Sequence, residues 1–205
     1  MNKAMGNVHK EYIRLFRNPW LERLTMVSIR NFLIAWALMI PVILWTAQGT
    51  AGWAESLGLF LEGLLVWSLT EYALHRFVFH WQSRWAPLAQ LIFMVHENHH
   101  VAPNDPMRNL MPLVVSVPIC ALVWAACLAI VGPAGTWVFV GFVISYVGYD
   151  LIHYGCHQWP LTHRLSGWFK AHHMRHHYAK VDGNYATTGM IWDRLFGTRI
   201  ISSKR

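Results

Sequence analysis

Four long apolar stretches divide the chain into alternating hydrophobic and polar segments. They cover residues 32–47, 57–74, 110–131 and 136–152. Each stretch approaches the roughly 20 residues that an α-helix needs to cross a bilayer. Prolines occur in the first and third stretches, and membrane helices tolerate proline where neighbouring groups satisfy the freed backbone. The pattern therefore predicts an all-α, integral-membrane fold with four transmembrane helices.

The basic residues indicate how these helices are oriented. All 17 Lys and Arg lie in three polar segments, at residues 3–30, 76–108 and 164–205. The two other connectors, near residues 46–56 and 131–135, are short and contain no Lys or Arg. Because positive residues are retained on the cytosolic side of a membrane, we expect both termini and the central connector to lie in the cytosol.

This topology divides the chain into an arm and a membrane domain. Residues 1–31 are predicted to be a basic arm, which is either an amphipathic helix over 8–30 at the membrane surface or a solvated arm with anchoring charges. Residues 32–205 are predicted to be the membrane domain, with cytosolic parts at 75–109 and 153–205. The N-terminus has no short apolar run followed by small residues, so we expect no cleaved signal peptide.

The composition agrees with a lipid environment. Of the 205 residues, 55% are hydrophobic and only 13% are charged, whereas soluble domains carry charge on about 25%. The net charge of +7 does not indicate nucleic-acid binding, because the basic residues follow the membrane topology instead of one binding face. We expect residence in a bacterial inner membrane rather than the endoplasmic reticulum.

The three cysteines lack CxxC spacing and are predicted to be small buried apolar residues.

Histidines are the candidate functional residues. Ten of the 13 fall in four groups, HRFVFH (75–80), HENHH (96–100), HYGCH (153–157) and HMRHH (173–177). Residues three or four positions apart share one face of a helix, so each of the last three groups can bring two or three imidazoles together. The first and last residues of HRFVFH are five apart, which predicts that the helix ends or is distorted between them. The topology puts all four groups at one membrane boundary.

Ten imidazoles at one boundary predict a site for two metal ions. Imidazole suits Fe, Zn, Cu and Ni, so the ligand type alone does not name the metal. Ten nitrogens are too many for one ion and would suit two with five each. Glu71 and Asp150 lie just before His75 and His153, where an unpaired acid is costly. Because metal-bound histidines usually donate their second N–H to a carboxylate or carbonyl, we expect these acids to be the acceptors or, alternatively, simple interfacial charges.

The order and surroundings of the histidine groups resemble a known family. From about Trp67 to Thr198 the chain is similar to the fatty acid hydroxylase / sterol desaturase superfamily, and most closely to its fatty-acid 2-hydroxylases. The resemblance rests on the segments WSLTEYALHRFVFH, HENHHVAPNDPMR, YVGYDLIHYGCHQWP, FKAHHMRHHY and TTGMIWDRLFGT. Two positions depart from the pattern: Glu97 follows the first histidine of HENHH, where close relatives have a small residue, and Gln158 stands where they often have a histidine.

The resemblance implies a four-helix membrane anchor under a cytosolic, histidine-rich dimetal cap. It implies O2-dependent hydroxylation of a lipid acyl chain, two iron ions, O2 as co-substrate, and electrons from a separate cytochrome- or ferredoxin-type protein. Zinc can occupy such a site in purified protein. The metal ligands that it implies are His75, His80, His96, His99, His100, His153, His157, His173, His176 and His177. In the last group His173 is preferred to His172 because HMRHHY keeps the spacing to Tyr178.

Other polar residues near these groups have less specific roles. Trp192 and Asp193 are expected to pack and cap the fold near its C-terminus. Asn184 and Arg108 are expected either to touch a polar headgroup or to lie in solvated loops. No catalytic residue beyond the metal ligands is predicted.

Three alternatives remain open at this point. The same histidine groups serve desaturases and hydroxylases of sterols, carotenoids or other lipids, because the outcome depends on which C–H bond faces the oxidant. A metal transporter or metal-storage protein would place polar ligands in the middle of the spans along a pathway. A structural zinc protein would typically use four ligands in a closed site.

Overall fold

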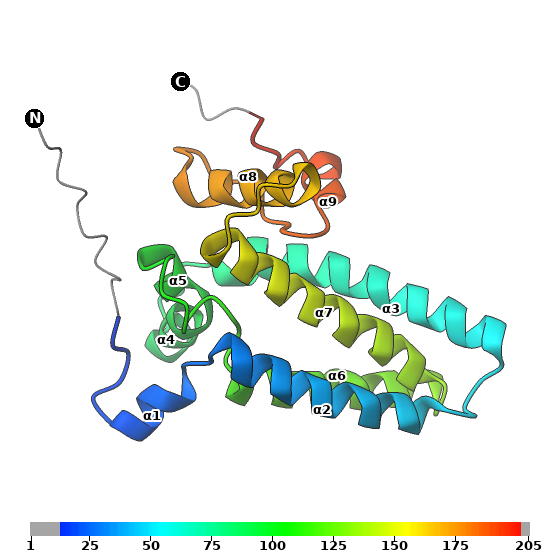
Figure 1. The fold of residues 1–205 in the computed structure, drawn as a ribbon. Coiled ribbons are helices and arrows are strands. Elements are labelled where there is room, and N and C mark those ends of the chain that lie inside the picture. The colour runs from blue at the N-terminus through cyan, green and yellow to red at the C-terminus, as the bar shows by residue number, and fades with distance from the viewer. Residues whose placement is uncertain (1–12, 202–205) are drawn as a thin grey trace, which may run out of the picture.

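Four long helices form the body of the molecule, which we describe from a computed structural model covering residues 13–201. They are α2 (Ile29–Ala47), α3 (Trp53–Leu74), α6 (Leu113–Val131) and α7 (Gly135–Gln158). Figure 1 shows that short connectors join α2 to α3 and α6 to α7 at one end of this bundle, whereas the remaining helices lie toward the other end. Every regular element within the described residues is a helix.

The four helices confirm the predicted spans. Each is long and apolar enough to cross a membrane, and the helix that begins at Trp53 continues without a break to Phe79. Several helix ends differ from the predicted bounds, including the starts of α2 at Ile29 and of α3 at Trp53. The third helix begins only after Pro112, whose ring is accepted at the cap position before the first turn. The fourth does not end at residue 152 but continues through Gln158, so HYGCH is part of α7.

Helix α7 is the centre of the bundle and packs against α2, α3 and α6. Its contact with α3 depends on two glycines. A Cβ on Gly63 would lie 2.0 Å from the carbonyl oxygen of Val138, and one on Gly141 would lie 2.0 Å from that of Phe60. Because such distances are far below van der Waals contact, the backbones of α3 and α7 can meet this closely only with glycine. This contact fixes the relative positions of the helix ends that carry His75 and His153.

Aromatic side chains fill the space around this contact. The ring of Trp67 lies 5.1 Å from the rings of both Phe142 and Tyr146, measured between centroids. The three cysteines are free, with Cys120 and Cys156 buried and Cys127 partly buried, as the sequence predicts.

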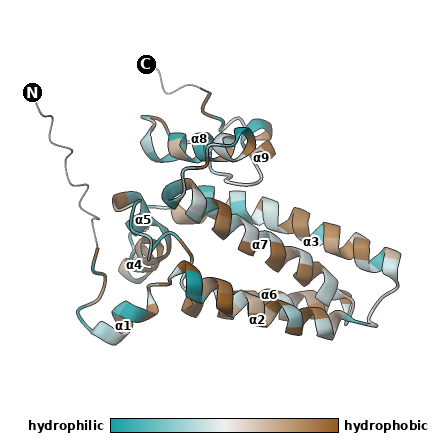
Figure 2. Cartoon of the chain, in the orientation of Figure 1, coloured by the Kyte–Doolittle hydropathy of each residue, from teal (hydrophilic) through white to brown (hydrophobic). Residues whose placement is uncertain are grey.

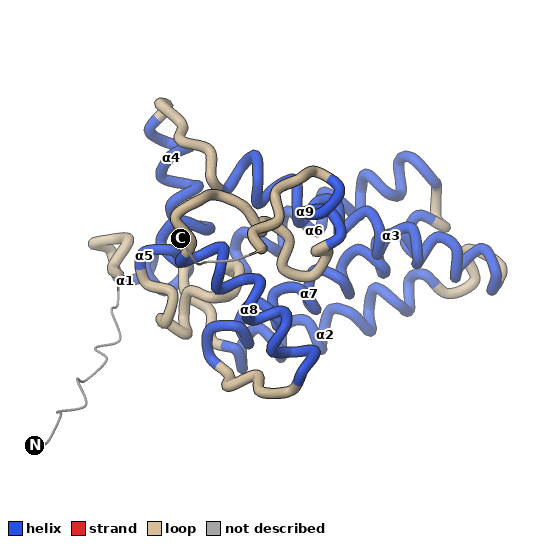
Figure 3. The backbone as a smooth tube through the Cα atoms, turned by 90° about the horizontal axis from the view of Figure 1, so that it is seen from above, coloured by secondary structure: helices blue, strands red, loops and turns tan. Residues whose placement is uncertain are grey.

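A polar cap covers one end of the bundle. Figure 2 shows hydrophilic residues concentrated in this cap and apolar residues along the long helices. Viewed from above in Figure 3, α8 and α9 lie over the bundle, with α4 and α5 beside them. The cap contains two π-helices and four α-helices, η1 (His75–Phe79), α4 (Ala86–Ile92), η2 (Phe93–Glu97), α5 (Asn98–Val101), α8 (Arg164–Tyr178) and α9 (Ile191–Leu195).

The N-terminal arm is attached to the cap by a buried ion pair. Within the described residues the arm before α2 has one short helix, α1 (Pro19–Leu24). The prediction of a continuous helix over 8–30 is therefore wrong for residues 13–30, and residues 8–12 lie outside the described part. Glu22 accepts a hydrogen bond from the buried guanidinium of Arg108, and the Val27 N–H donates to Met107 O at 3.1 Å. Arg108 therefore holds the arm, and neither a headgroup contact nor a solvated role fits it.

Candidate metal centre

The first cluster of histidines forms where α3 changes into a π-helix. In a π-helix residues five apart lie one turn apart, so His75 and His80 point in the same direction. The distortion predicted from their spacing is therefore confirmed. Imidazole nitrogens from three separate segments meet here, with one potential ligand atom from each residue within 4.8 Å of every other. We call this set the His75 group; it contains His75, His80, His96, His100 and His176.

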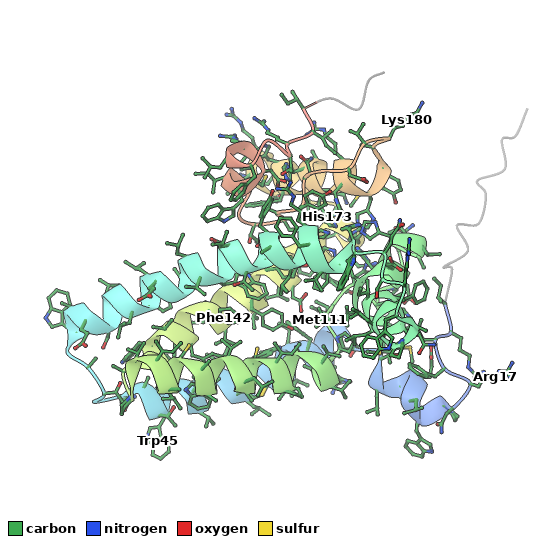
Figure 4. All side chains as sticks on the ribbon, turned by 180° about the vertical axis from the view of Figure 1, so that it is seen from behind. Arg17, Trp45, Met111, Phe142, His173 and Lys180 are labelled. Atoms are coloured by element: carbon green, nitrogen blue, oxygen red, sulfur yellow. The ribbon has the colours of Figure 1, made fainter. Side chains whose placement is uncertain are left out.

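A second cluster lies beside the first and also has five members. Its ligand atoms again lie within 4.8 Å of one another, and they come from α5, α7 and α8. We call this set the His99 group; it contains His99, His153, His157, His173 and His177. The two groups are in contact, because the rings of His100 and His177 stack with their centroids 4.2 Å apart. Figure 4 shows His173 where α8 meets the bundle.

All ten predicted histidines are thus brought together, and the two other histidines in the described residues lie outside both groups. His172 points away from the clusters, and His163 caps the start of α8, where its ring accepts a hydrogen bond from Leu165 N–H. His9 lies outside the described residues. The choice of His173 over His172 agrees with this arrangement, since only His173 has a nitrogen within the His99 group.

The contacts inside the groups suit nitrogens that coordinate a shared cation. Nδ1 of His75 lies 2.5 Å from Tyr185 O, and Nδ1 of His176 lies 2.8 Å from Gly183 O, so both Nδ1 atoms carry their proton. The Nε2 atoms of the same two rings are therefore lone pairs, yet they lie only 2.9 Å apart. Two lone pairs at this distance repel each other unless a cation lies between them. The donor set fits a metal ion.

The His99 group gives the same indication. His153 donates from Nδ1 to Asn109 O at 2.8 Å, which leaves a lone pair on Nε2. That Nε2 is buried and has no hydrogen-bond partner among the described residues. Nε2 of His177 lies 3.0 Å from Nε2 of His99 and 3.1 Å from that of His173. A buried nitrogen without a partner is costly, and coordination of a metal ion would satisfy it.

Burial keeps these rings neutral, which is the form that binds metal. Burial, together with the neighbouring histidines, lowers the pKa of His100 to about 2, and burial is the main cause that lowers the pKa of His176 to about 4. Burial also places the pKa values of His96, His99 and His173 well below the usual range for histidine. Since neutral imidazole is the ligand form, the rings are ready to coordinate at pH 7.

We expect the metal-free protein to lose stability on acidification. The folded-state pKa values lie below the unfolded value of about 6.5, so the unfolded chain binds more protons between the two. Stability is therefore fully present above about pH 6.5 and falls as the pH is lowered. Thermal unfolding of the chelator-treated protein should show a falling midpoint between pH 7 and pH 5. A midpoint that stays constant or rises over this range would contradict the neutral, buried state of the rings.

The two predicted acid partners have other roles. Glu71 accepts hydrogen bonds from Thr187 N–H at 2.5 Å, from Thr188 N–H at 2.8 Å and from the Thr188 hydroxyl. Asp150 accepts a longer bond from Met111 N–H at 3.3 Å. The prediction that these acids accept hydrogen bonds from His75 and His153 is therefore wrong. The backbone carbonyls of Tyr185 and Asn109 accept from the Nδ1 atoms of these two rings instead. Glu71 instead ties the C-terminal segment to α3.

A carboxylate–histidine pair does occur, at a place that sequence reasoning did not indicate. The fully buried Asp193 lies 3.1 Å from Nε2 of His172 and accepts hydrogen bonds from Tyr185 N–H, Ala186 N–H and the Thr198 hydroxyl. Asp193 is therefore the packing and capping residue that the sequence predicts. Buried Asn184 bridges the same region, since its amide donates to His172 O and its oxygen accepts from Ile200 N–H. It neither lies in a solvated loop nor faces a headgroup.

An apolar cavity of about 390 Å³ lies between the long helices and the cap. Its lining is almost entirely apolar and includes Trp67, Val115 and Cys120. Met111 and Tyr149 line both this cavity and a narrower one that contains His96, His99 and His153. Figure 4 shows Met111 and Phe142 pointing into the space between α3, α6 and α7. The shared lining residues therefore place the apolar cavity next to the smaller one at the two histidine groups.

Comparison with known proteins finds one family. The family model described as fatty acid hydroxylase matches residues 60–198. A dihydroceramide fatty acyl 2-hydroxylase of Arabidopsis thaliana is 30% identical over 196 residues, which are 92% of this chain and 81% of the relative. A fatty acid 2-hydroxylase of Macaca fascicularis is 33% identical over 213 residues, which are 92% of this chain and 57% of that protein. The chain thus spans little more than half of the animal relative.

A solved structure has the same fold. It is described as full-length scs7p with only the hydroxylase domain visible, and it superposes with a TM-score of 0.81 at 28% identity, covering 91% of this chain and 71% of that chain. The sequence relatives named above come from a plant and an animal. They do not favour a bacterial inner membrane, so the membrane of residence stays a prediction.

Proposed function

This chain belongs to the fatty acid hydroxylase family, and we propose that it hydroxylates the acyl chain of a membrane lipid with O2 at a pair of iron ions. One observation carries the proposal: two adjoining groups of five histidines lie at the end of an apolar cavity between membrane-spanning helices. The site thus combines a metal-binding donor set with a space that suits a hydrocarbon chain.

The ten histidines of the His75 and His99 groups would hold the two ions. Bound iron would supply the reductive activation of O2 that attack on an unactivated C–H bond requires. The overall reaction converts R–H, O2, two electrons and two protons into R–OH and water. The reaction consumes two electrons in each turnover, and we propose a separate cytochrome- or ferredoxin-type protein as their donor.

Imidazole ligands do not select iron over zinc by themselves. Zn²⁺ binds such sites more tightly than Fe²⁺ in the general order of affinities, so purified protein can contain zinc without being a zinc enzyme. Ten histidines in two adjoining groups exceed the four ligands of a typical structural zinc site. The position of the groups at one end of the bundle also does not support a transport pathway, which would place ligands along the spans.

The cavity determines which part of the substrate reaches the histidines. An acyl chain in it would lie among apolar side chains of α3, α6 and α7, with one end near His96 and His153. The relatives named above are 2-hydroxylases, one of them acting on dihydroceramide fatty acyl groups. We therefore propose carbon 2 of the acyl chain as the position of attack. Desaturation, or hydroxylation of a sterol or carotenoid, would give products of different mass.

The proposed orientation in the membrane rests on the difference between the two ends of the bundle. All described Lys and Arg of the N-terminal arm, the central connector and the C-terminal segment lie toward the histidine end. We propose that this end, with both termini and the cap, faces the cytosol, because the short connectors at the other end contain no basic residue. A reductase or its carrier protein would then reach the cap from the cytosol.

Lipid analysis of a host with and without the gene tests the function. We expect acyl chains with one added hydroxyl group to accumulate with the wild-type gene in oxygenated culture. The variant His157→Ala should leave the lipids as they are without the gene. Indistinguishable lipid pools in all three cultures would refute the hydroxylase proposal.

We expect Val115→Phe to shift the enzyme toward shorter acyl chains. Val115 lines the apolar cavity, and a phenyl ring there would fill part of it. The neighbouring Val114 is 45% exposed and does not line the cavity, so Val114→Phe is the matched control. Competition between acyl chains of different length, read by mass spectrometry, measures the effect. If both variants keep the wild-type length preference, the cavity is not the acyl-binding site.

A further inference from the structure

Asn109 connects two rings of the His99 group from opposite sides. Its backbone carbonyl accepts the hydrogen bond from Nδ1 of His153 on α7, at 2.8 Å. Its side-chain amide nitrogen lies 2.9 Å from Nδ1 of His99 on α5. The two helices are joined at this point by a single residue that is 2% exposed. The orientation of both rings therefore depends on where Asn109 is held.

Asn109 is itself fixed by polar contacts. Its amide nitrogen donates to Pro103 O at 2.8 Å, and its amide oxygen accepts from the side-chain nitrogen of Gln158 at 2.7 Å. Gln158, at the last position of α7, also donates to Asn104 O at 3.1 Å. Residues 103–109 are thus tied to the end of the helix that carries His153 and His157.

The His75 group has different supports. The Nδ1 atoms of His75 and His176 face the backbone carbonyls of Tyr185 and Gly183, in the C-terminal segment. None of the contacts described for Asn109 involves a ring of this group. The two groups are therefore oriented by two separate parts of the chain, although their rings touch.

An asparagine suits this position because its amide can act either as donor or as acceptor. In the present orientation the NH2 group donates to Nδ1 of His99, which places the ring proton on Nε2. Metal coordination through Nε2 requires the proton on Nδ1. A 180° turn of the Asn109 amide would present its oxygen to that N–H; the turn would also give up the bond to Pro103 O and require the Gln158 amide to turn with it. An apolar side chain could serve neither form of the ring.

We propose that Asn109 is a positioning residue for the metal ion of the His99 group and for that ion alone. The inference rests on the proposed dimetal function, and it names the residue on which retention of one of the two ions depends. It also gives Gln158 a role, since that side chain holds the Asn109 amide.

Metal stoichiometry tests this directly and requires no catalytic turnover. Purified wild-type protein and the Asn109→Ala variant are reconstituted with Zn²⁺, passed through a chelating column, and assayed for bound zinc by mass spectrometry. We expect two ions in the wild type and one in Asn109→Ala. Asn98→Ala is the matched control, because Asn98 is equally buried at 2% and, among the described residues, its amide donates to Phe93 O and Met94 O and to no histidine ring.

Double variants show which ion is lost. Combining Asn109→Ala with His157→Ala removes two features of the same group and should still leave one ion. Combining it with His100→Ala affects both groups and should leave none. The proposal is overturned if Asn109→Ala keeps two ions or loses both. It is also overturned if Asn98→Ala loses an ion, or if the double variant of Asn109→Ala and His100→Ala retains one. A wild type that holds two ions without hydroxylating lipid would refute only the proposed function.

Discussion

The variant His99→Ala should form no hydroxylated lipid above background. His99 is fully buried, and its Nε2 lies 3.0 Å from that of His177 within one group of five potential ligands. Changes to groups that merely orient metal ligands already cost roughly 10–100-fold in affinity or activity. Loss of a ligand should therefore lower product formation by at least about 100-fold. Product by mass spectrometry and metal content measured on the same preparation check this result.

A histidine outside both groups provides the control for this variant. His163 lies at the start of α8, where it accepts a hydrogen bond from Leu165 N–H at 3.4 Å. We expect His163→Ala to keep both ions and wild-type product formation. If His99→Ala behaves like His163→Ala, the clustered imidazoles are not the catalytic centre.

The variant Asp193→Ala should be severely destabilised. Its carboxylate is completely buried and accepts hydrogen bonds from Tyr185 N–H at 2.9 Å and Ala186 N–H at 3.0 Å, beside Nε2 of His172. Removing this acceptor leaves buried N–H donors without a partner, and each such loss costs about 1–3 kcal/mol. The free energy of unfolding, or the fraction of folded protein after detergent extraction, measures the loss.

The same substitution at an exposed acid shows whether the loss of stability comes from burial of the carboxylate or from its charge alone. Asp182 lies in the same segment but is exposed, so Asp182→Ala should change stability by no more than about 0.5 kcal/mol. Because the Tyr185 carbonyl accepts from His75, Asp193→Ala should also weaken metal retention in the His75 group. Equal stability of the two variants would contradict the role given to Asp193.

Much of the fold can be predicted from the sequence because membrane helices leave a strong local signal. The apolar lengths and the distribution of Lys and Arg indicate four spans, and four such helices are present. The spacing of His75 and His80 predicts a helix distortion, and a π-helix occurs there. The apolar bounds of the fourth span stop at residue 152 because the polar histidines after it lower the hydropathy, whereas the spacing of His153 and His157 predicts that both lie on a helix, as α7 shows.

The partners of the histidines could not be predicted because they are distant in sequence. His75 contacts the carbonyl of Tyr185, 110 residues away, and Glu71 contacts Thr187, 116 residues away. Every residue has a backbone carbonyl, so the sequence does not show which carbonyl accepts a given hydrogen bond. The nearby carboxylates of Glu71 and Asp150 are therefore the acceptors that the sequence favours. The sequence predicts that Trp192 and Asp193 pack and cap the fold, but nothing local indicates that Asp193 faces His172, 21 residues before it.

Isotope labelling tests the central claim most directly. Protein reconstituted with Fe²⁺ and supplied with an electron-donor protein is incubated with a long-chain acyl lipid under ¹⁸O2. We predict a product with one ¹⁸O atom in a hydroxyl group on carbon 2 of the acyl chain, and no product from the same mixture with His99→Ala. Iron-loaded, reduced wild-type protein that gives no labelled product, or a hydroxyl group whose oxygen comes from water, would contradict the account.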